Sequence, residues 1–325
     1  MIGRDISIDV SLQNIWQAWY IFRRGKKRTA DFDAFSYNLE ANFFQLYQEL
    51  TDGSYKHGSY KSFPLTDTKK RIISVASLRD RVIHRLLYDY LIQIFDRTFI
   101  YDAWSCRKNK GLLGAILRTQ QLLMRYPNAY VWRGDITKFF DSVDHQVLKK
   151  QIKKRVSDLY ALQLIDNIID SYSSYAPGKG MPIGNLTSQV FTNVYLHELD
   201  FYISHTIKPL GYVRYGDDFI LLANTLEQAQ QWREHLIVFI DQILQLSIHK
   251  TNNIIVKTKQ GVHFLGCDIY PTGRRLRKRV YNRVQERLNF INCSSYRALF
   301  LAHSKQKMIQ WFDWNMRGIM DQLCV

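Results

Sequence analysis

The sequence predicts an α+β fold with a split βαβ core. Three observations indicate this fold. Apolar residues three and four positions apart predict an amphipathic helix over residues 78–95. Strand-forming residues occur at 130–136 and in a predicted hairpin at 211–222. Helices are predicted from about Thr187 to Ile207 and over 226–246, so the middle of the chain alternates strand, helix, strand, strand, helix and strand.

The flanking segments carry their own local signals. Residues 11–50 are predicted to be helical apart from a basic loop at 23–33, and residues 55–75 are typical of short strands between turn residues. Asp144 is a suitable N-cap for the helix that begins HQVLKKQ. Further strands are predicted over 252–270, and the tail from 274 to 325 is predicted to be helical throughout.

The chain is strongly basic, since 45 Lys and Arg against 29 Asp and Glu give its 325 residues a net charge of +16. Such a surplus favours a polyanionic partner, and nucleic acid is the commonest one. An acidic membrane is the alternative, but no apolar run approaches the length of a membrane span and no basic amphipathic helix or lipidation motif occurs at either end. The four cysteines lack zinc-site spacing. We therefore expect reduced thiols, a cytoplasmic location and no membrane partner.

Residues 214–222 (RYGDDFILL) place the adjacent Asp217 and Asp218 on a tight turn between strand-forming residues. A lone motif of this kind is often a solvated turn, but the flanking apolar and aromatic residues favour a buried hairpin. Asp135 ends the apolar strand YVWRG, so the sequence predicts a cluster of three carboxylates. At ~4 Å and an effective dielectric of ~20, each pair would repel by about 4 kcal/mol. Either one carboxyl group stays protonated or a divalent cation binds.

Carboxylate oxygens completed by water are the ligands that Mg²⁺ selects. Two such ions can activate an attacking hydroxyl group and stabilise the pyrophosphate that leaves in an in-line phosphoryl transfer. A basic protein with this site is most simply a nucleotidyl transferase that acts on nucleic acid. No G-x-x-x-x-G-K-[ST] motif occurs, so P-loop ATPase chemistry has no support.

Several ordered segments resemble the palm motifs of reverse transcriptases: DITKFFDSVD, GMPIGNLTSQVFTNVYLHELD, RYGDDFILL, LSIHKTNNIIV and HFLG. Upstream, KKRIISVASLRDRVIHRLL and SCRKNKG resemble the fingers motifs of that family. The resemblance implies a right-hand polymerase with fingers over 1–130, a palm over 131–272 and a small helical thumb over 273–325. Residues from about 145 to 182 would contribute to the fingers. IGNLTSQ is most similar to the bacterial enzymes of diversity-generating retroelements, and phage-defence reverse transcriptases come next.

The resemblance implies an RNA-directed DNA polymerase in the cytoplasm of a bacterium. Its partners would be an RNA template, a DNA or RNA primer and dNTPs, and its cofactors two Mg²⁺ ions, with Mn²⁺ as an alternative ion. The metal ligands of the family fall on Asp135, Asp217 and Asp218, with the backbone carbonyl of Ile136 as an additional ligand. Asp141 and Asp144 are expected to serve the local turn and the helix N-cap.

The nucleotide site follows from the same resemblance. Phe140 matches the aromatic residue that excludes a ribose 2′-OH by steric contact, whereas Phe139 is expected to lie in the core. Ile183 stands where retroviral enzymes carry Gln, and shape alone discriminates by only about 1–3 kcal/mol, so we expect low fidelity. The other expected nucleotide contacts are Lys69 and Arg71 with Lys70 between them, Gln189 with Ser188, and Lys250.

Primer and template contacts are expected at the end of the palm and the start of the thumb. HFLGCDIY, which contains Gly266, resembles the hairpin that holds the primer end. The segment RRLRKRVYNRVQER (274–287) has seven Arg or Lys among its 14 residues and includes Arg274, Arg275 and Arg277. Its basic face would follow a duplex backbone, with an affinity that falls steeply in salt.

Other functions stay open from the sequence. RNA-dependent RNA polymerases also carry G-D-D, and Asp135 with Asp141 resembles their paired-aspartate motif, although Phe140 and HFLG favour DNA synthesis. The alternative outside the enzymes is a palm that binds RNA without catalysis. Against it, all three predicted metal ligands, Asp135, Asp217 and Asp218, are present in the sequence. A role in a retroelement and a role in phage defence both remain open from the sequence. So do the identity of the template, the priming mode, the oligomeric state and partners such as a small basic accessory protein.

Overall fold

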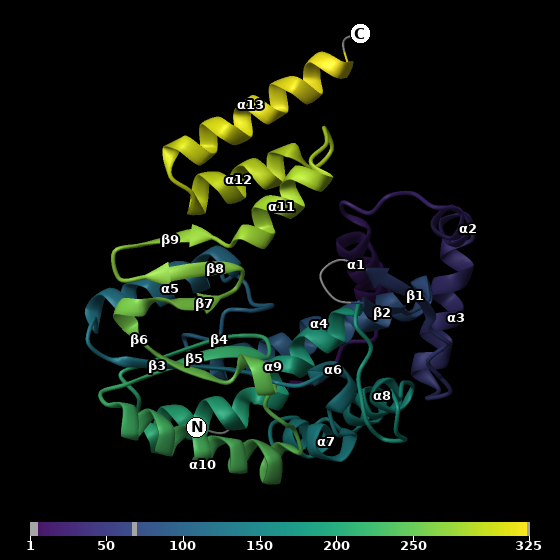
Figure 1. Ribbon diagram of the computed structural model, residues 1–325. Helices are drawn as coiled ribbons and strands as arrows, with labels where there is room; N and C mark the ends of the chain where they lie inside the picture. The colour runs from purple at the N-terminus through teal and green to yellow at the C-terminus, as the bar shows by residue number, and fades with distance from the viewer. Residues whose placement is uncertain (1–5, 67–69, 324–325) are drawn as a thin grey trace. The chain divides into compact units, whose positions relative to one another are not determined.

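The computed structural model describes residues 6–66 and 70–323, except for the side chains of 66, 70 and 319–323 (Figure 1). The chain packs as two compact units. Unit 1 contains the described residues up to Ile100 together with Ile136–Phe201 and Phe239–Ser247, and unit 2 contains Tyr101–Asp135, Tyr202–Val238 and the described residues from Ile248. These units divide the chain differently from the predicted fingers, palm and thumb, whose boundaries stay predictions.

The N-terminal part of unit 1 is helical, as its periodicity predicts. Its helices are α1 (Leu12–Arg23), α2 (Ala30–Tyr37), α3 (Leu39–Thr51) and α4 (Leu78–Phe95). Trp19 of α1 is fully buried, and its ring packs on Phe32 at a centroid distance of 5.2 Å and on Phe43 at 6.1 Å. Helices α1, α2 and α3 therefore share one aromatic core, and α1 and α2 also contact α4.

Strands and further helices complete unit 1. The predicted strands at 55–75 form an antiparallel hairpin of β1 (Lys61–Thr66) and β2 (Lys70–Val75). The other helices are α6 (Phe139–Ser142), α7 (His145–Lys153), α8 (Leu159–Asp170) and α9 (Leu186–Tyr202). The π-helical turn Ile203–Ile207, which follows α9 along the chain, belongs to unit 2. The Asp144 side chain accepts hydrogen bonds from the backbone N–H groups of Gln146 and Val147, which confirms the predicted N-cap of α7.

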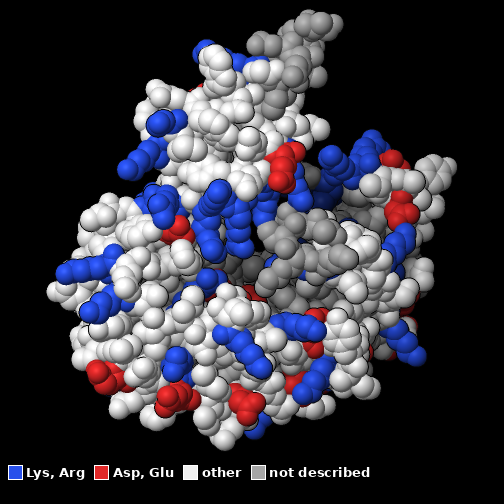
Figure 2. All heavy atoms as spheres, in the orientation of Figure 1, with Lys and Arg blue, Asp and Glu red and all other residues white. Residues whose placement is uncertain are grey.

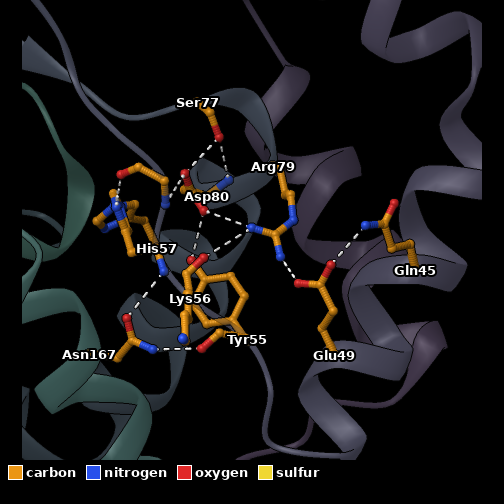
Figure 3. Close-up of polar contacts among 11 residues, drawn as sticks. Gln45, Glu49, Tyr55, Lys56, His57, Ser77, Arg79, Asp80 and Asn167 are labelled. Atoms are coloured by element: carbon orange, nitrogen blue, oxygen red, sulfur yellow. Dashed lines mark hydrogen bonds and ion pairs between the residues drawn. The ribbon is translucent and has the colours of Figure 1, made fainter.

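A buried carboxylate organises the polar interior of unit 1 (Figure 3). Asp80, in the first turn of α4, is 1% exposed. Its oxygens accept hydrogen bonds from Tyr55 Oη at 2.9 Å, Ser77 Oγ at 2.7 Å and the Gly58 backbone N–H at 3.2 Å. Arg79 lies over the Tyr55 ring and forms ion pairs with Glu49 and Asp80. The carboxylate thus connects the loop after α3 to the start of α4.

Unit 2 contains the predicted split βαβ core. Its four-stranded sheet has the order β4-β5-β3-β6, with all neighbouring strands antiparallel. The strands are β3 (Tyr130–Asp135), β4 (Gly211–Tyr215), β5 (Asp218–Ala223) and β6 (Ile254–Lys257), and α10 (Leu226–Leu244) connects β5 to β6. The fully buried Val131 of β3 and Ile220 of β5 belong to the apolar core of the unit.

The C-terminal part of unit 2 corrects one prediction. A three-stranded sheet is formed by β7 (Val262–Phe264), β8 (Cys267–Tyr270) and β9 (Gly273–Leu276), so residues 274–276 are strand and not helix. The chain turns at Pro271-Thr272 and pairs with β8, which buries Leu276. Helices follow only afterwards, as α11 (Lys278–Arg287), α12 (Cys293–His303) and α13 (Gln306–Leu323).

One apolar core runs through unit 2. It joins Val131 and Val213 of the four-stranded sheet to Leu276 of β9 and to Phe300 and Phe312 of the C-terminal helices. Helix α5 (Leu112–Arg125) contacts both β4 and β8, and α12 contacts β9. Within the described ranges, none of the helices combines the length and the apolar character that a membrane crossing needs.

Candidate active site

Strand pairing brings the predicted carboxylates together in unit 2. Asp135 is the last residue of β3 and is the direct antiparallel partner of Asp218, the first residue of β5. Side chains of direct partners lie on the same face of a sheet, with Cα atoms about 4.5–5.5 Å apart. Asp217 occupies the turn between β4 and β5 beside Gly216, whose φ of +64° suits a residue without a side chain. The three aspartates therefore gather at one end of the sheet.

The turn is held in place by two residues that the sequence prediction missed. The Gly216 backbone N–H donates a hydrogen bond to Ser105 Oγ at 2.9 Å, and Arg214 Nη1 donates one to the Gly216 carbonyl at 3.0 Å. Arg214 is fully buried, and its backbone is hydrogen-bonded to Asp102 and Trp104. Segment 102–105 therefore fixes the position of the turn. Both residues lie inside the motifs SCRKNKG and RYGDD, but neither motif by itself indicates that they hold this turn.

Donors of the chain itself bind two of the carboxylates. Arg133 Nε and Nη2 donate to the two oxygens of Asp218 at 3.0 and 2.8 Å. Asn252 Nδ2, in the short 3₁₀ helix Lys250–Asn252, donates to Asp135 Oδ2 at 2.5 Å. The sequence prediction named neither Arg133 nor Asn252 as a functional residue.

The electrostatics of the cluster follow from burial and from like charge. Burial raises the pKa of the Asp218 carboxyl to about 6, while the hydrogen bonds and charge of Arg133 oppose that increase. The negative charges of Asp135 and Asp217 raise this pKa further. Asp218 therefore lies close enough to Asp135 and Asp217 for their negative charges to disfavour its ionised form. A divalent cation between the three would relieve this repulsion.

The donor set fits a hard divalent cation in its chemistry, because all three predicted ligands are carboxylates. Within the part of the chain that the structure describes, no group of three His, Cys, Asp or Glu side chains is already arranged around a metal position. At Asp218, Arg133 binds both carboxylate oxygens. Asp135, Asp217 and Asp218 are the residues that would hold the ions.

The remaining predicted residues of unit 2 have different environments. Lys250 is exposed, and Gly266 lies in the turn between β7 and β8 with a φ of +82°. Arg275 and Arg277 lie at 3.3 and 3.8 Å from oxygens of Asp268. Arg274 is a packing residue, because its guanidinium donates to His303 Nδ1, Gln120 Oε1 and the Ala302 carbonyl. These donors connect β9 to α5 and α12, and the predicted contact of Arg274 with nucleic acid stays a prediction.

The predicted nucleotide-site residues belong to unit 1, except for Lys250. Phe140 is half-buried, its neighbour Phe139 is a core residue as predicted, and Ile136 is buried. The Ile183 carbonyl accepts a hydrogen bond from the Ser74 backbone N–H at 3.0 Å, which places the IGN segment beside β2. Arg71 of β2 is exposed. Lys69 falls outside the described residues, as does the side chain of Lys70.

A basic cavity of ≈ 400 Å³ lies around Gln189 in unit 1. Gly184, Asn185 and Leu186 form part of its wall. Its cationic lining residues, which the sequence prediction did not name, are Arg24, Lys26, Arg81 and Arg85. Such a cavity suits a phosphate-bearing ligand. Among the charged side chains on the face of the molecule shown in Figure 2, Lys and Arg predominate, in keeping with the net charge of +16.

Comparisons with known proteins identify the family of the chain. Residues 56–269 match the family model described as reverse transcriptase (RNA-dependent DNA polymerase). Protein YkfC of Escherichia coli is 25% identical over 264 residues, which cover 68% of this chain and 69% of YkfC. The group II intron-encoded protein LtrA of Lactococcus lactis is 23% identical over 309 residues, which cover 73% of this chain but only 50% of LtrA.

Among solved structures, an apo telomerase of Candida tropicalis is similar, with a TM-score of 0.48, 12% identity and coverage of 69% of this chain and 55% of the telomerase. The family match includes Asp135, Asp217 and Asp218, because all three lie within residues 56–269. It also includes the strands β3 to β6, which bring these aspartates together. The chain belongs to the reverse transcriptase family.

Proposed function

We propose that the protein is an RNA-directed DNA polymerase that copies an RNA template into cDNA. The observation that carries this proposal is the register of the sheet, which pairs Asp135 with Asp218 next to Asp217. When bound there, two Mg²⁺ ions, or Mn²⁺ in their place, would activate the primer hydroxyl and neutralise charge on the departing pyrophosphate. The match of residues 56–269 to the reverse transcriptase family supports the same activity.

Some residues of the chain would position the aspartates, and others would bind nucleic acid or nucleotide. Ser105 and Arg214 hold the turn that carries Asp217, and Asn252 orients Asp135. Arg275 and Arg277, at the start of the basic 274–287 segment, would bind the phosphates of a primer–template duplex, with Gly266 in the adjacent turn close to the primer end. In unit 1, Arg71, Lys69, Gln189 and the basic cavity around Gln189 would bind nucleotide or template phosphates. Lys250 of unit 2 is a separate proposed phosphate contact.

Primer extension on a defined template tests the proposal. The purified protein is given polyriboadenylate annealed to an oligodeoxythymidylate primer, Mg²⁺, and either dTTP or UTP. We expect extension with dTTP. Preferential use of UTP would instead identify an RNA-dependent RNA polymerase, and binding of the RNA without any extension would identify a non-catalytic RNA-binding palm.

Phe140→Ala should weaken the discrimination against ribonucleotides. We propose that the half-buried ring of Phe140 occupies the space of a ribose 2′-OH. A steric contact of this kind is worth about 10- to 200-fold in selectivity. The ratio of kcat/KM for dTTP over UTP should therefore fall about tenfold or more in the alanine variant. Phe140→Tyr, which keeps the ring, is the control and should retain the ratio. If the ratio did not change in Phe140→Ala, Phe140 would not be the residue that excludes the ribose 2′-OH.

Ile183→Gln should lower the misincorporation frequency. The Ile183 backbone is fixed by its hydrogen bond with Ser74, so the substitution changes the side chain without moving the segment. We propose that the apolar side chain aligns the base pair by shape alone, which discriminates by only about 1–3 kcal/mol. Sequencing of cDNA made on one template by the native enzyme, Ile183→Gln and the apolar control Ile183→Leu measures the effect. Equal error frequencies in all three would reject the proposal.

We further infer that the enzyme works in a diversity-generating retroelement of a bacterium, in the cytoplasm. The IGNLTSQ motif favours this role. Phage defence is the second candidate, because Gly216 stands where retroelement enzymes often carry Met. Sequencing the nucleic acid that copurifies with the protein, before and after incubation with dNTPs, distinguishes them. A retroelement enzyme should carry RNA of an adjacent template repeat, and a gene for a small basic accessory protein should lie nearby.

A further inference from the structure

Strand β3 carries a cation two positions before Asp135. Side chains alternate along a strand, so Arg133 and Asp135 lie on the same face. The direct partner of Asp135 is Asp218, which places Arg133 diagonally across from Asp218, within reach of a long side chain. Its guanidinium binds both Asp218 oxygens, at 3.0 and 2.8 Å. The side chains of Arg133 and Asp218 are only 13% and 17% exposed.

This pairing uses the oxygens that a metal ion needs. Two parallel hydrogen bonds between a guanidinium and a carboxylate are among the strongest polar contacts in proteins. An arginine does not lose its proton in a protein, so Arg133 stays positively charged. Its guanidinium can leave the Asp218 carboxylate only if the whole side chain moves. Space for such movement exists, because Arg133 also lines a cavity of ≈ 170 Å³ together with His263, Asp268 and Tyr270.

We propose that Arg133 competes with the divalent cation for Asp218 and thereby keeps the metal affinity of the free protein low. Metal binding then requires the guanidinium to turn away from Asp218 toward the neighbouring cavity. Asp135 does not face the same competition, because its partner Asn252 is a neutral amide that leaves one Asp135 oxygen available. This inference rests on the proposed function, since it takes Asp135, Asp217 and Asp218 as the metal ligands.

Mn²⁺ binding to the full-length protein without nucleic acid tests the competition. Free Mn²⁺ is followed by electron paramagnetic resonance for the native protein, Arg133→Gln, Arg133→Lys and Asp218→Asn. Arg133→Gln should bind Mn²⁺ about tenfold more tightly or better, the change that corresponds to losing one charge-assisted hydrogen bond. Arg133→Lys should show a smaller gain, because an ammonium group keeps the charge but not the two parallel bonds.

The matched control is Arg297→Gln. Arg297 also binds an aspartate through Nε and Nη2, but this pair with Asp313 lies on exposed side chains of α12 and α13. The control removes the same single charge, so its Mn²⁺ affinity should stay within about twofold of the native value. Melting curves in EDTA show whether each variant is folded. Arg133→Lys carries the test if Arg133→Gln does not fold.

The outcomes separate this inference from the proposed function. If Asp218→Asn loses Mn²⁺ while both Arg133 variants bind it no more tightly than the native protein, Arg133 is a permanent counter-ion and the competition is overturned. The proposed metal site would survive that result. If Asp218→Asn binds Mn²⁺ as tightly as the native protein, Asp218 is not a metal ligand, and both the competition and the metal site as proposed fail.

Discussion

Asp217→Asn should abolish DNA synthesis and leave RNA binding nearly unchanged. Asparagine has almost the same shape as aspartate and tolerates the same turn, so the hairpin held by Ser105 and Arg214 should persist. The substitution removes one of the proposed charged ligands. Loss of one such electrostatic group typically costs about 10²–10³-fold in rate. Primer extension with dTTP measures the activity, and fluorescence anisotropy with the same labelled primer–template measures binding.

Asp313→Asn is the control for that variant. Asp313 is an aspartate of the same unit whose exposed carboxylate pairs with Arg297 on the surface of the helices. We expect it to retain native activity, which would show that losing one negative charge has no general effect. Native-like synthesis by Asp217→Asn, within about tenfold of the unmodified protein, would contradict the assignment of Asp217 as a metal ligand.

Asp80→Ala should lower the free energy of unfolding by about 3–5 kcal/mol, the usual cost of removing one partner from a buried charged network. The variant leaves the Tyr55 hydroxyl and the Gly58 N–H without their acceptor, and Arg79 loses one of its two ion pairs (Figure 3). Ser77 also loses its carboxylate acceptor at the start of α4. Urea denaturation followed by circular dichroism measures the change.

Asp31→Ala is the matched control for stability. Asp31 also pairs with a single cation, Lys61, but both side chains are largely exposed. Exposed ion pairs contribute little to stability, so the urea midpoint should hardly move. If Asp80→Ala lost less than about 1 kcal/mol, the network of Figure 3 would be a surface-like arrangement and not an organising centre of unit 1.

Local signals in the sequence predicted much of the fold. The helix expected over 78–95 is α4 with the same limits, and Asp144 caps α7 as expected, because periodicity and capping depend on residues a few positions apart. The error at 274–276 has the opposite cause. Those residues form β9 because they pair with β8 and bury Leu276, and a row of arginines carries no local signal of that pairing.

The candidate site shows the same difference between features that local sequence predicts and features that depend on distant contacts. Sequence order and motif predicted Asp135, Asp217 and Asp218, and strand register brings the pair Asp135 and Asp218 together. The sequence did not predict which donors bind them. Arg133 binds a carboxylate 85 positions away, Asn252 one 117 positions away, and Ser105 a backbone group 111 positions away. Such partners become visible only once the chain is folded.

The apolar core of unit 2 has a consequence for shortened or recombined forms of this protein. Val131 in β3, the strand that ends at Asp135, and Phe300 and Phe312 in the last helices are buried in the same interior. A chain cut after residue 272 would lose Leu276, Val284, Phe300 and Phe312 from this core, so we expect a shortened fragment to need the C-terminal helices for its stability. Chimaeras that exchange the C-terminal segment between relatives should exchange α5 with it, because Arg274 joins α5 to α12.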